Sequence, residues 1–333
     1  DWNRREIKDC PDLLNLASAV LPSRSLQIHY RSVYRELIAF SNVAFYSRTL
    51  SIPSKRPASQ VKKSRPIEVI NVNSVYDKQV NIGEAWKIAE VLKEIWSVPA
   101  SERPTVGVIS FNLKQANLIL EVLNEMALKD HSFKSAYEEE NKRKEGGEDV
   151  GFFVKNLESV QGDERDIIVF STTFGRDSTG AFRRNFGKLG QLGGERRLNV
   201  AVTRAKTKVI MVTSLPVEEI SDFLTRSGSA TIPRDYFQAY MNYAIKVSNG
   251  SLDAAAKSLE RLSADEGSWS PDDGGAKDPF IMDVAAYLHS IGYEPITRQQ
   301  DDNDAFNVDI AIENPTTGLY GIGIECDAPN HRL

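Results

Sequence analysis

The sequence predicts an α/β protein in which helices cover both faces of a parallel sheet. Two runs, residues 105–110 and 167–170, are apolar without the alternation of a half-buried strand, as expected for strands buried on both faces. Residues 84–96 and 113–128 flank the first run and repeat apolar side chains at helical spacing. Buried strands that alternate with amphipathic helices are typical of a parallel sheet.

The length and composition are those of an ordinary globular protein with two domains. The chain has 333 residues, of which 41% are hydrophobic and 26% charged, and a net charge of −5. Binding to nucleic acid would therefore have to come from local basic patches. No apolar run is long enough to span a membrane and no signal peptide is recognisable, so we expect no membrane partner. The two cysteines, Cys10 and Cys326, match no metal-binding spacing and agree with a cytoplasmic protein.

The first part of the chain contains several further expected elements. Residues 1–25 are expected to be the tail of a preceding lobe or a linker, and residues 26–30 a strand followed by a helix over 32–42. Residues 51–66 are rich in Pro, Ser and Lys, and we expect a solvated linker there, with the rim of a nucleic-acid channel as the alternative. Residues 67–72 form the next expected strand.

Two polar segments follow. Residues 129–149 are rich in Glu and Lys, which predicts an exposed mobile loop, and residues 152–154 a short strand. Residues 175–194 combine basic side chains with Phe182 and Phe186 and several glycines. This pattern fits single-strand binding through stacking and charge, and it fits equally well an ordered loop held by its two phenylalanines.

Residues 195–206 predict a short helix with one buried face. Its apolar side chains recur at positions i, i+3, i+4 and i+7, and an apolar strand over 208–213 follows at once. Arg197, Arg204 and Lys206 lie off the apolar stripe. A projecting arginine on a fixed helix suits phosphate binding, whereas the alternative is a surface helix whose arginines extend into solvent.

Three segments in order, residues 28–32, 158–171 and 195–206, resemble motifs IV, V and VI of superfamily 1 helicases of the nonsense-decay-helicase type. The resemblance covers roughly residues 20–215. It implies that residues 26–230 form the second RecA-like lobe of such a helicase, a P-loop NTPase-type fold. Residues 231–266 would then be a helical connector.

The resemblance implies an ATP site, with Mg²⁺ as the accompanying ion. Tyr30 would stack on the adenine, and Arg31 and Arg204 would be catalytic residues at the γ-phosphate. Glu164 would hold the ribose after a turn made by Gln161 and Gly162. The chemistry agrees, because an aromatic face accepts a flat base and a guanidinium forms paired hydrogen bonds with phosphate oxygens.

The resemblance also implies a channel for single-stranded nucleic acid, with DNA favoured over RNA. The expected contacts are at a strand's carboxyl edge and on the two later motifs: Ser110, Phe111, Gln115, Ser159 and Arg197. Ligands of open α/β sheets bind at that edge. Asn112 has the alternative role of capping the following helix.

No G-x-x-x-x-G-K-[ST] phosphate loop occurs in the 333 residues, although the resemblance requires one in the first RecA-like lobe. We therefore expect that lobe, in the same polypeptide, to be the partner of this one, and this chain alone to be inactive. The predicted function is the C-terminal part of an ATP-dependent helicase or translocase. The alternative is a nucleic-acid-binding scaffold without motor activity that presents a nuclease domain.

The C-terminal part, residues 267–333, is expected to be a separate incomplete domain after the Gly/Pro/Ser/Asp-rich linker 267–276. A helix over 279–291 and strands over 293–299, 306–313 and 319–325 resemble the start of a very-short-patch-repair-like PD-(D/E)xK endonuclease. A hairpin symmetric about Thr316 would place Asp309 opposite Gly323 and diagonal to Glu325. The implied site has Asp309 and Glu325 as Mg²⁺ ligands and Asp327 as a third catalytic residue.

Overall fold

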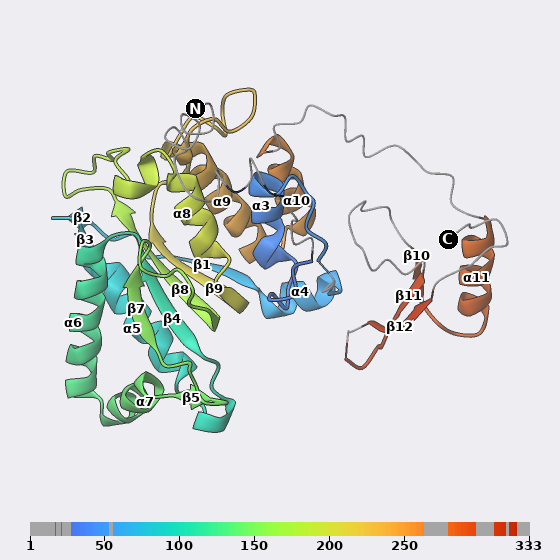
Figure 1. Ribbon diagram of the computed structural model, residues 1–333, viewed down its shortest axis with the longest axis horizontal. Helices are drawn as coiled ribbons and strands as arrows, with labels where there is room; N and C mark the ends of the chain where they lie inside the picture. Colours follow the sequence, from blue (N-terminus) through green and yellow to red (C-terminus); the bar gives the residue numbers. More distant parts are fainter. Residues whose placement is uncertain are drawn as a thin grey trace.

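The fold is built on a five-stranded parallel sheet. The computed structural model describes Ala17, Leu21 and residues 28–52, 56–262, 279–297, 310–317 and 320–324. The strands lie in the order β1 (Ile67–Asn71), β9 (Ala205–Ser214), β8 (Arg165–Gly175), β4 (Val106–Ser110) and β7 (Phe153–Asn156), and every neighbouring pair is parallel. Helices cover both faces (Figure 1). The predicted RecA-like α/β class is confirmed.

Strand β8 is the central strand of the sheet, and it is also the longest. Each of its 11 residues except Asp166 is buried, and the strand spans about 35 Å from end to end. Alternate side chains enter opposite cores: Ile168 and Phe170 face one set of helices, Ile167 and Val169 the other. The apolar run that the sequence contains therefore reflects burial on both faces.

One face of the sheet is covered by α5 (Ile82–Ile95) and α6 (Leu113–Lys129). Both helices begin at an asparagine whose side chain accepts a backbone N–H, Asn81 from Glu84 and Asn112 from Gln115. Such caps satisfy amide groups that have no partner inside the helix. The expected capping role of Asn112 is thus confirmed.

The other face is covered by α3 (Glu36–Phe45), α8 (Gly194–Val202), α9 (Pro233–Ser248) and α10 (Leu252–Leu259). Phe237, Tyr240 and Met241 of α9 are almost fully buried in the same core as the sheet. Up to residue 262, the segment expected to be a connector, residues 231–266, therefore packs into the same core as the sheet. The sequence concealed this, because amphipathic helices have the same pattern whether they pack on their own sheet or on a neighbour.

Two predictions near the beginning of the chain need correction, and one element there was not predicted. The expected strand over 26–30 is reduced, among described residues, to an isolated bridge between Ile28 and Ser51. The predicted linker 51–66 contains a helix, α4 (Ala58–Ser64), whose Val61 is buried. A small hairpin, β2 (Tyr76–Asp77) and β3 (Val80–Asn81), precedes α5.

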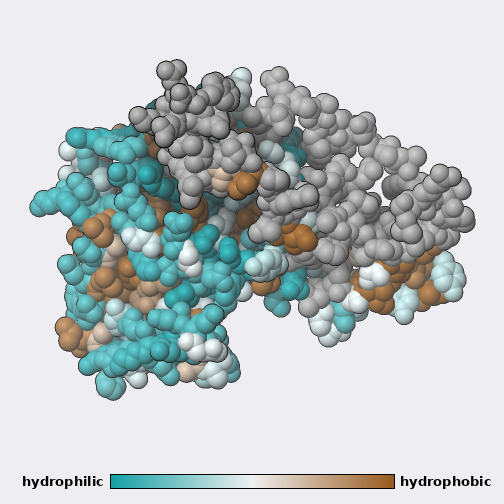
Figure 2. All heavy atoms as spheres, in the orientation of Figure 1, coloured by the Kyte–Doolittle hydropathy of each residue, from teal (hydrophilic) through white to brown (hydrophobic). Residues whose placement is uncertain are grey.

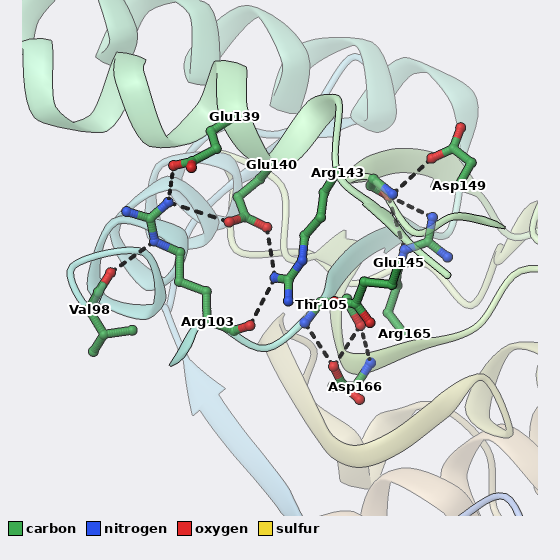
Figure 3. A network of polar contacts seen from close by, with 11 residues as sticks. Val98, Arg103, Thr105, Glu139, Glu140, Arg143, Glu145, Asp149, Arg165 and Asp166 are labelled. Carbon is green, nitrogen blue, oxygen red and sulfur yellow. Dashed lines mark hydrogen bonds and ion pairs between the residues drawn. The ribbon is translucent and has the colours of Figure 1, made fainter. Parts of the chain in front are cut away.

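The expected mobile loop over 129–149 is wrong. The segment forms α7 (His131–Asn141) and a hairpin of β5 (Lys144–Glu145) and β6 (Glu148–Asp149). Polar contacts hold it in place (Figure 3): buried Glu140 accepts from both Arg103 and Arg143, at 3.4 and 3.1 Å, and Arg143 also donates to the Arg103 carbonyl. Trp96 of the α5 C-terminus packs against Phe133 of α7. The Glu/Lys-rich composition hid these fixed contacts.

Helix α8 depends on two successive glycines. Gly193 has a φ of 79°, in the left-handed region that favours glycine. A Cβ on Gly194 would lie 2.1 Å from the Leu189 carbonyl oxygen. The predicted apolar stripe is buried, but the helix ends at Val202, and Ala205 already belongs to β9.

The substitution Gly194→Ala is expected to destabilise the fold. Because the added methyl group meets a backbone carbonyl that cannot rotate away, we expect a loss of about 1–3 kcal/mol. Equilibrium unfolding in urea measures the change. Gly190→Ala is the matched control, since its nearest added contact is 3.8 Å away; equal effects of both changes would contradict the steric argument.

The C-terminal region contains α11 (Pro279–Ser290) and the antiparallel strands β10 (Pro295–Thr297), β11 (Ile310–Glu313) and β12 (Tyr320–Ile324). The expected helix and strands are present. The hairpin register differs from the prediction: Gly323 lies opposite Ala311, not Asp309, because pairing is offset by two residues from symmetry about Thr316. Asp309, Glu325 and Asp327 lie outside the described residues.

Candidate functional site

Side chains at the amino end of the sheet form one candidate site. Glu164 directly precedes β8, and Arg204 directly precedes β9. The Glu164 carboxylate contacts Arg31 Nε at 2.6 Å through Oε2 and Lys206 Nζ at 3.2 Å through Oε1. The fold thus brings together residues from all three motifs. Lys206 is the member that the sequence argument did not assign to this site, although its position off the apolar stripe was the available signal.

The charges in this cluster alter one another's protonation. Partial burial by itself raises the pKa of Glu164, but the hydrogen bond from Lys206 and the charge of Arg31 outweigh that effect and lower it. Glu164 is therefore ionised at neutral pH, with an acceptor oxygen held by each cation. A carboxylate in this state accepts a hydroxyl hydrogen bond well.

Arg204 has a different environment. Its Nε donates to the Val200 carbonyl at 2.7 Å and one terminal nitrogen to Thr203 Oγ1 at 3.2 Å. Among the described residues it has no ion pair within 4 Å. Burial, and then the neighbouring charge of Arg31, lower its pKa. A partly buried guanidinium without a carboxylate favours an anionic ligand.

Two backbone hydrogen bonds fix the segment that carries Tyr30 and Arg31, one to strand β9 of the sheet and one to Ser51 outside it. His29 N donates to the Ser51 carbonyl and Val33 N to the Lys206 carbonyl, both at 2.8 Å. The Tyr30 side chain is 88% exposed, so its ring is free of the core. Gln161 and Gly162 are also exposed, and Gly162 has a φ of 92°, as the expected turn before Glu164 requires.

His29 gives this segment a dependence on pH. Burial, and then the charge of Arg31, lower the pKa of His29 to about 4. Its Nε2 accepts the Ser32 N–H at 3.2 Å, and protonation would abolish that acceptor. Between pH 6.5 and 4 the unfolded chain binds more protons than the native chain, so stability is lost as pH falls through this window.

We expect the contribution of His29 to stability to fall by about 1–3 kcal/mol between pH 6.5 and 4, taken as the difference between wild type and His29→Gln at each pH. The difference is needed because the buried Glu84 carboxyl, whose pKa is raised to about 7, changes stability in the opposite direction over the same range. His29→Gln keeps a polar side chain but does not titrate at this position. Thermal unfolding at successive pH values measures the difference. His131→Gln, at an exposed position on α7, should leave the wild-type slope, and an unchanged slope in His29→Gln would exclude His29 as the cause.

A groove of about 660 Å³ lies at the opposite, carboxyl end of the strands. Aromatic side chains line it at Phe111, Phe174 and Tyr76, and three cations, Lys78, Arg183 and Lys188, stand around it. In the described part of the chain none of these cations forms an ion pair. The visible surface in Figure 2 is mainly hydrophilic, with hydrophobic side chains only in small groups. Three carboxylates, Asp77, Glu158 and Asp177, line the groove as well. Aromatic rings beside cations that form no ion pair suit a single-stranded nucleic acid.

The predicted nucleic-acid residues are placed unequally. Ser110 and Gln115 are fully buried and bind within the protein: Ser110 Oγ donates to the Asn112 carbonyl, and Gln115 bonds the backbone of Asn81. These two expectations are corrected, since neither presents a polar atom to the groove. Tertiary contacts that the sequence does not show occupy the Gln115 amide, whereas the Ser110 hydroxyl bonds a carbonyl two residues further along the chain. Phe111 lines the groove.

The later motifs supply the remaining candidates. Ser159 is exposed and its hydroxyl donates to Asn156 Oδ1 at 2.6 Å. Arg197 Nε lies 4.0 Å from Glu158, a groove-lining residue, and its Nη1 is buried without a hydrogen-bond partner. Both positions are close to the groove in sequence or contact, without lining it.

For the loop after β8, within residues 175–194, the structure decides in part between single-strand binding and an ordered loop held by its phenylalanines. Phe186 is almost fully buried against Phe174, with ring centroids 5.3 Å apart, and Phe182 packs beside it. Phe182 and Phe186 hold the loop, whereas Phe174, which belongs to β8, also lines the groove. Arg184 is paired with Asp222 and Arg176 with Glu219, whereas Arg183 and Lys188 line the groove. The basic residues, not the aromatics, therefore supply its ligand-facing side chains.

Residues 157–164 connect the two ends of the sheet. They leave β7 beside the groove, where Leu157 and Glu158 line it, and reach the amino end of β8 at Glu164. Leu157 and Val160 are buried in the core on the way. A fixed crossing segment with one end in each site is suited to transmit movement between them.

The parallel sheet with helices on both faces defines a lobe of the RecA-like α/β class. A family model described as an AAA domain matches residues 13–215, more than half of the chain. The chain belongs to this family.

Two curated relatives are similar over about half of the chain. An uncharacterized ATP-dependent helicase, MG140, of Mycoplasma genitalium is 36% identical over 185 residues, and its homolog in Mycoplasma pneumoniae is 34% identical over 186. Each alignment covers 55% of this chain but 15% of the relative, so the chain spans a small part of their length. The C-terminal domain of a possible DNA helicase from Lactobacillus plantarum is 15% identical, with a TM-score of 0.31, covering 55% of this chain and 86% of that one.

Two features are absent from the described residues. None of the helices in the described ranges is both long and apolar enough to cross a membrane. Within those same ranges, no group of three His, Cys, Asp or Glu side chains could hold a metal ion. The predicted metal site at Asp309 and Glu325 remains a prediction for residues beyond them.

Proposed function

We propose that the chain is the C-terminal part of an ATP-dependent helicase or translocase. The amino-end cluster would bind ATP against a first RecA-like lobe, and the groove would bind single-stranded nucleic acid, with DNA favoured. The single observation that carries this proposal concerns the half-buried Arg204 guanidinium. It lies near Arg31 and Glu164 but forms no ion pair with a carboxylate of the described residues.

The residues present fit a nucleotide. Tyr30 offers a free ring for the base, Glu164 an ionised carboxylate for ribose hydroxyls, and Arg31 and Arg204 positive charge for phosphates. Bound ATP with Mg²⁺ supplies the phosphoanhydride bond whose hydrolysis drives movement. Arg204 then stabilises negative charge that develops at the phosphates, in a site that partly excludes water.

Two anions, the Glu164 carboxylate and a bound phosphate, would compete for Arg31. In this structure it is paired with Glu164 at 2.6 Å, and a phosphate would compete for the same guanidinium. We infer that closure of the two lobes on the nucleotide redistributes this pair, and that Lys206 keeps Glu164 ionised meanwhile. Residues 157–164 would carry the resulting displacement to the groove, where it alters the grip on the strand.

Arg204→Ala tests the nucleotide site in the full-length protein. We expect strand-stimulated ATP turnover to fall by roughly 10³-fold or more, because an arginine that stabilises the transferring phosphate contributes that much. Binding of single-stranded DNA should stay near normal. Arg197→Ala is the comparison, with a smaller effect on turnover, since Arg197 lies near Glu158 rather than at the nucleotide end. Normal turnover in Arg204→Ala would mean that this arginine is structural.

Removing the rim cations tests the groove. In the double substitution Arg183→Ala, Lys188→Ala we expect weaker binding of a fluorescent oligothymidylate and a shallower salt dependence, by roughly 0.7 in logarithmic slope per lost phosphate contact. Arg184→Ala, on the same loop but paired with Asp222, should change the slope little. If both variants bind like wild type, the strand does not occupy this groove.

The competing function is a nucleic-acid-binding scaffold without motor activity. It predicts groove binding that depends on Arg183 and Lys188 but no ATP turnover stimulated by the strand in the full-length protein. The same two measurements therefore separate the candidates.

A further inference from the structure

A buried carboxylate lies directly beneath the groove. Glu84, in the first turn of α5, is 0% exposed, and among the described residues it has no cationic partner. Four groups from the carboxyl ends of β8 and β9 donate to it: Ser171 Oγ at 2.6 Å, Thr173 N at 2.7 Å, Ser214 N at 2.8 Å and Thr172 Oγ1 at 3.3 Å. Both carboxylate oxygens are used, each by one backbone N–H.

The strand that Glu84 holds is locally strained. Thr173 has a φ of 68°, which is unfavourable for a β-branched residue. The pairing of β8 with β9 also shifts register between Ser171 and Gly175. Such a conformation persists only where the surroundings impose it. Here the Thr173 amide is fixed by the Glu84 carboxylate.

The strained residue directly precedes the groove. Phe174 and Gly175 are the next two residues, and both line it. Phe174 also packs edge-on against Tyr76, another lining residue, with ring centroids 5.6 Å apart. The direction of the chain at Thr173 therefore sets where the aromatic wall of the groove stands.

The buried side-chain amide of Gln115 joins the β2–β3 hairpin to the same strand. Gln115 Nε2 donates to the Asn81 carbonyl at 2.9 Å and to Ser171 Oγ at 3.1 Å, and Gln115 Oε1 accepts the Asn81 N–H at 2.7 Å. Asn81 ends the hairpin that carries Lys78 and Gln79 into the groove lining. Ser171 thus joins Gln115 and Glu84 into one buried polar cluster.

We propose that Glu84 is a positioning residue for the groove: its carboxylate holds Thr173 in the left-handed conformation and thereby places Phe174 for the strand. This role rests on the proposed binding of nucleic acid in the groove. A glutamine does not replace the carboxylate, because its NH₂ group would face the N–H of either Thr173 or Ser214, two donors against each other.

The experiment measures oligothymidylate binding to the full-length protein by fluorescence anisotropy. Glu84→Gln should weaken binding about tenfold, an effect typical of one misplaced stacking contact. The KM for ATP should stay at the wild-type value, because the nucleotide cluster lies at the far end of β8.

The substitution Thr173→Gly distinguishes a positioning role of Glu84 from a general structural role, because only a positioning role predicts that binding is recovered. Glycine adopts positive φ without steric cost, so the turn no longer needs to be imposed. We expect the double variant Glu84→Gln, Thr173→Gly to recover binding to within about threefold of wild type. Thr173→Gly alone should bind like wild type.

Each outcome decides a different point. Weak binding in the Arg183, Lys188 variant together with wild-type binding in Glu84→Gln would overturn this inference and leave the groove in place. Wild-type binding in both would overturn the proposed groove itself. If Glu84→Gln does not fold, Ser171→Ala takes its place, because this variant removes one hydrogen-bond donor to Glu84 and keeps the carboxylate. Wild-type binding by a folded Ser171→Ala variant would also overturn the inference. So would a Ser171→Ala, Thr173→Gly double variant that binds no better than Ser171→Ala alone.

Discussion

The burial of β8 between β9 and β4 is the constraint on which the rest of the structure depends. A strand with both faces and both edges covered has no freedom to shift, because a one-residue slip would send every apolar side chain to the wrong core. Its two ends are therefore fixed points about 35 Å apart. The arginine–glutamate cluster is built at one end, where β8 follows Glu164, and the groove at the other, where β8 leads into Phe174.

The two ends stabilise a glutamate in opposite ways. Glu164 is partly exposed and shares its charge with Arg31 and Lys206, so burial costs it little and the ions around it remain available to a ligand. Burial raises the pKa of Glu84 to about 7, although hydrogen bonds from Ser171, Thr173 and Ser214 favour its ionised form. Neutral donors satisfy its oxygens without introducing a second charge into the core. The first arrangement suits exchange of partners, and the second suits a fixed geometry.

The amino-acid composition led to wrong predictions for segments whose polar side chains form hydrogen bonds and ion pairs within the protein. Residues 129–149 have the Glu and Lys content of a solvated loop, yet Glu140 lies buried between Arg103 and Arg143. Similarly, Gln115 follows a strand end and has the chemistry of a ligand contact, but Asn81 and Ser171 occupy its amide. In both cases at least one partner is distant in sequence, by 37 positions for Glu140 and Arg103 and by 56 for Gln115 and Ser171, so no local pattern reveals that contact.

The sequence by itself determined the parallel α/β class, the helices that became α5 and α6, and the three segments that supply Arg31, Glu164 and Arg204. These depend on periodicity, on caps such as Asn112 and on the order of motifs, all of which are local properties. The tertiary structure alone decided that α9 belongs to the sheet's core, that Lys206 joins Glu164, and that Gly323 pairs with Ala311. Those outcomes depend on which segments, distant in sequence, pack against each other. The free energy of that packing depends on both segments together and cannot be inferred from either one alone.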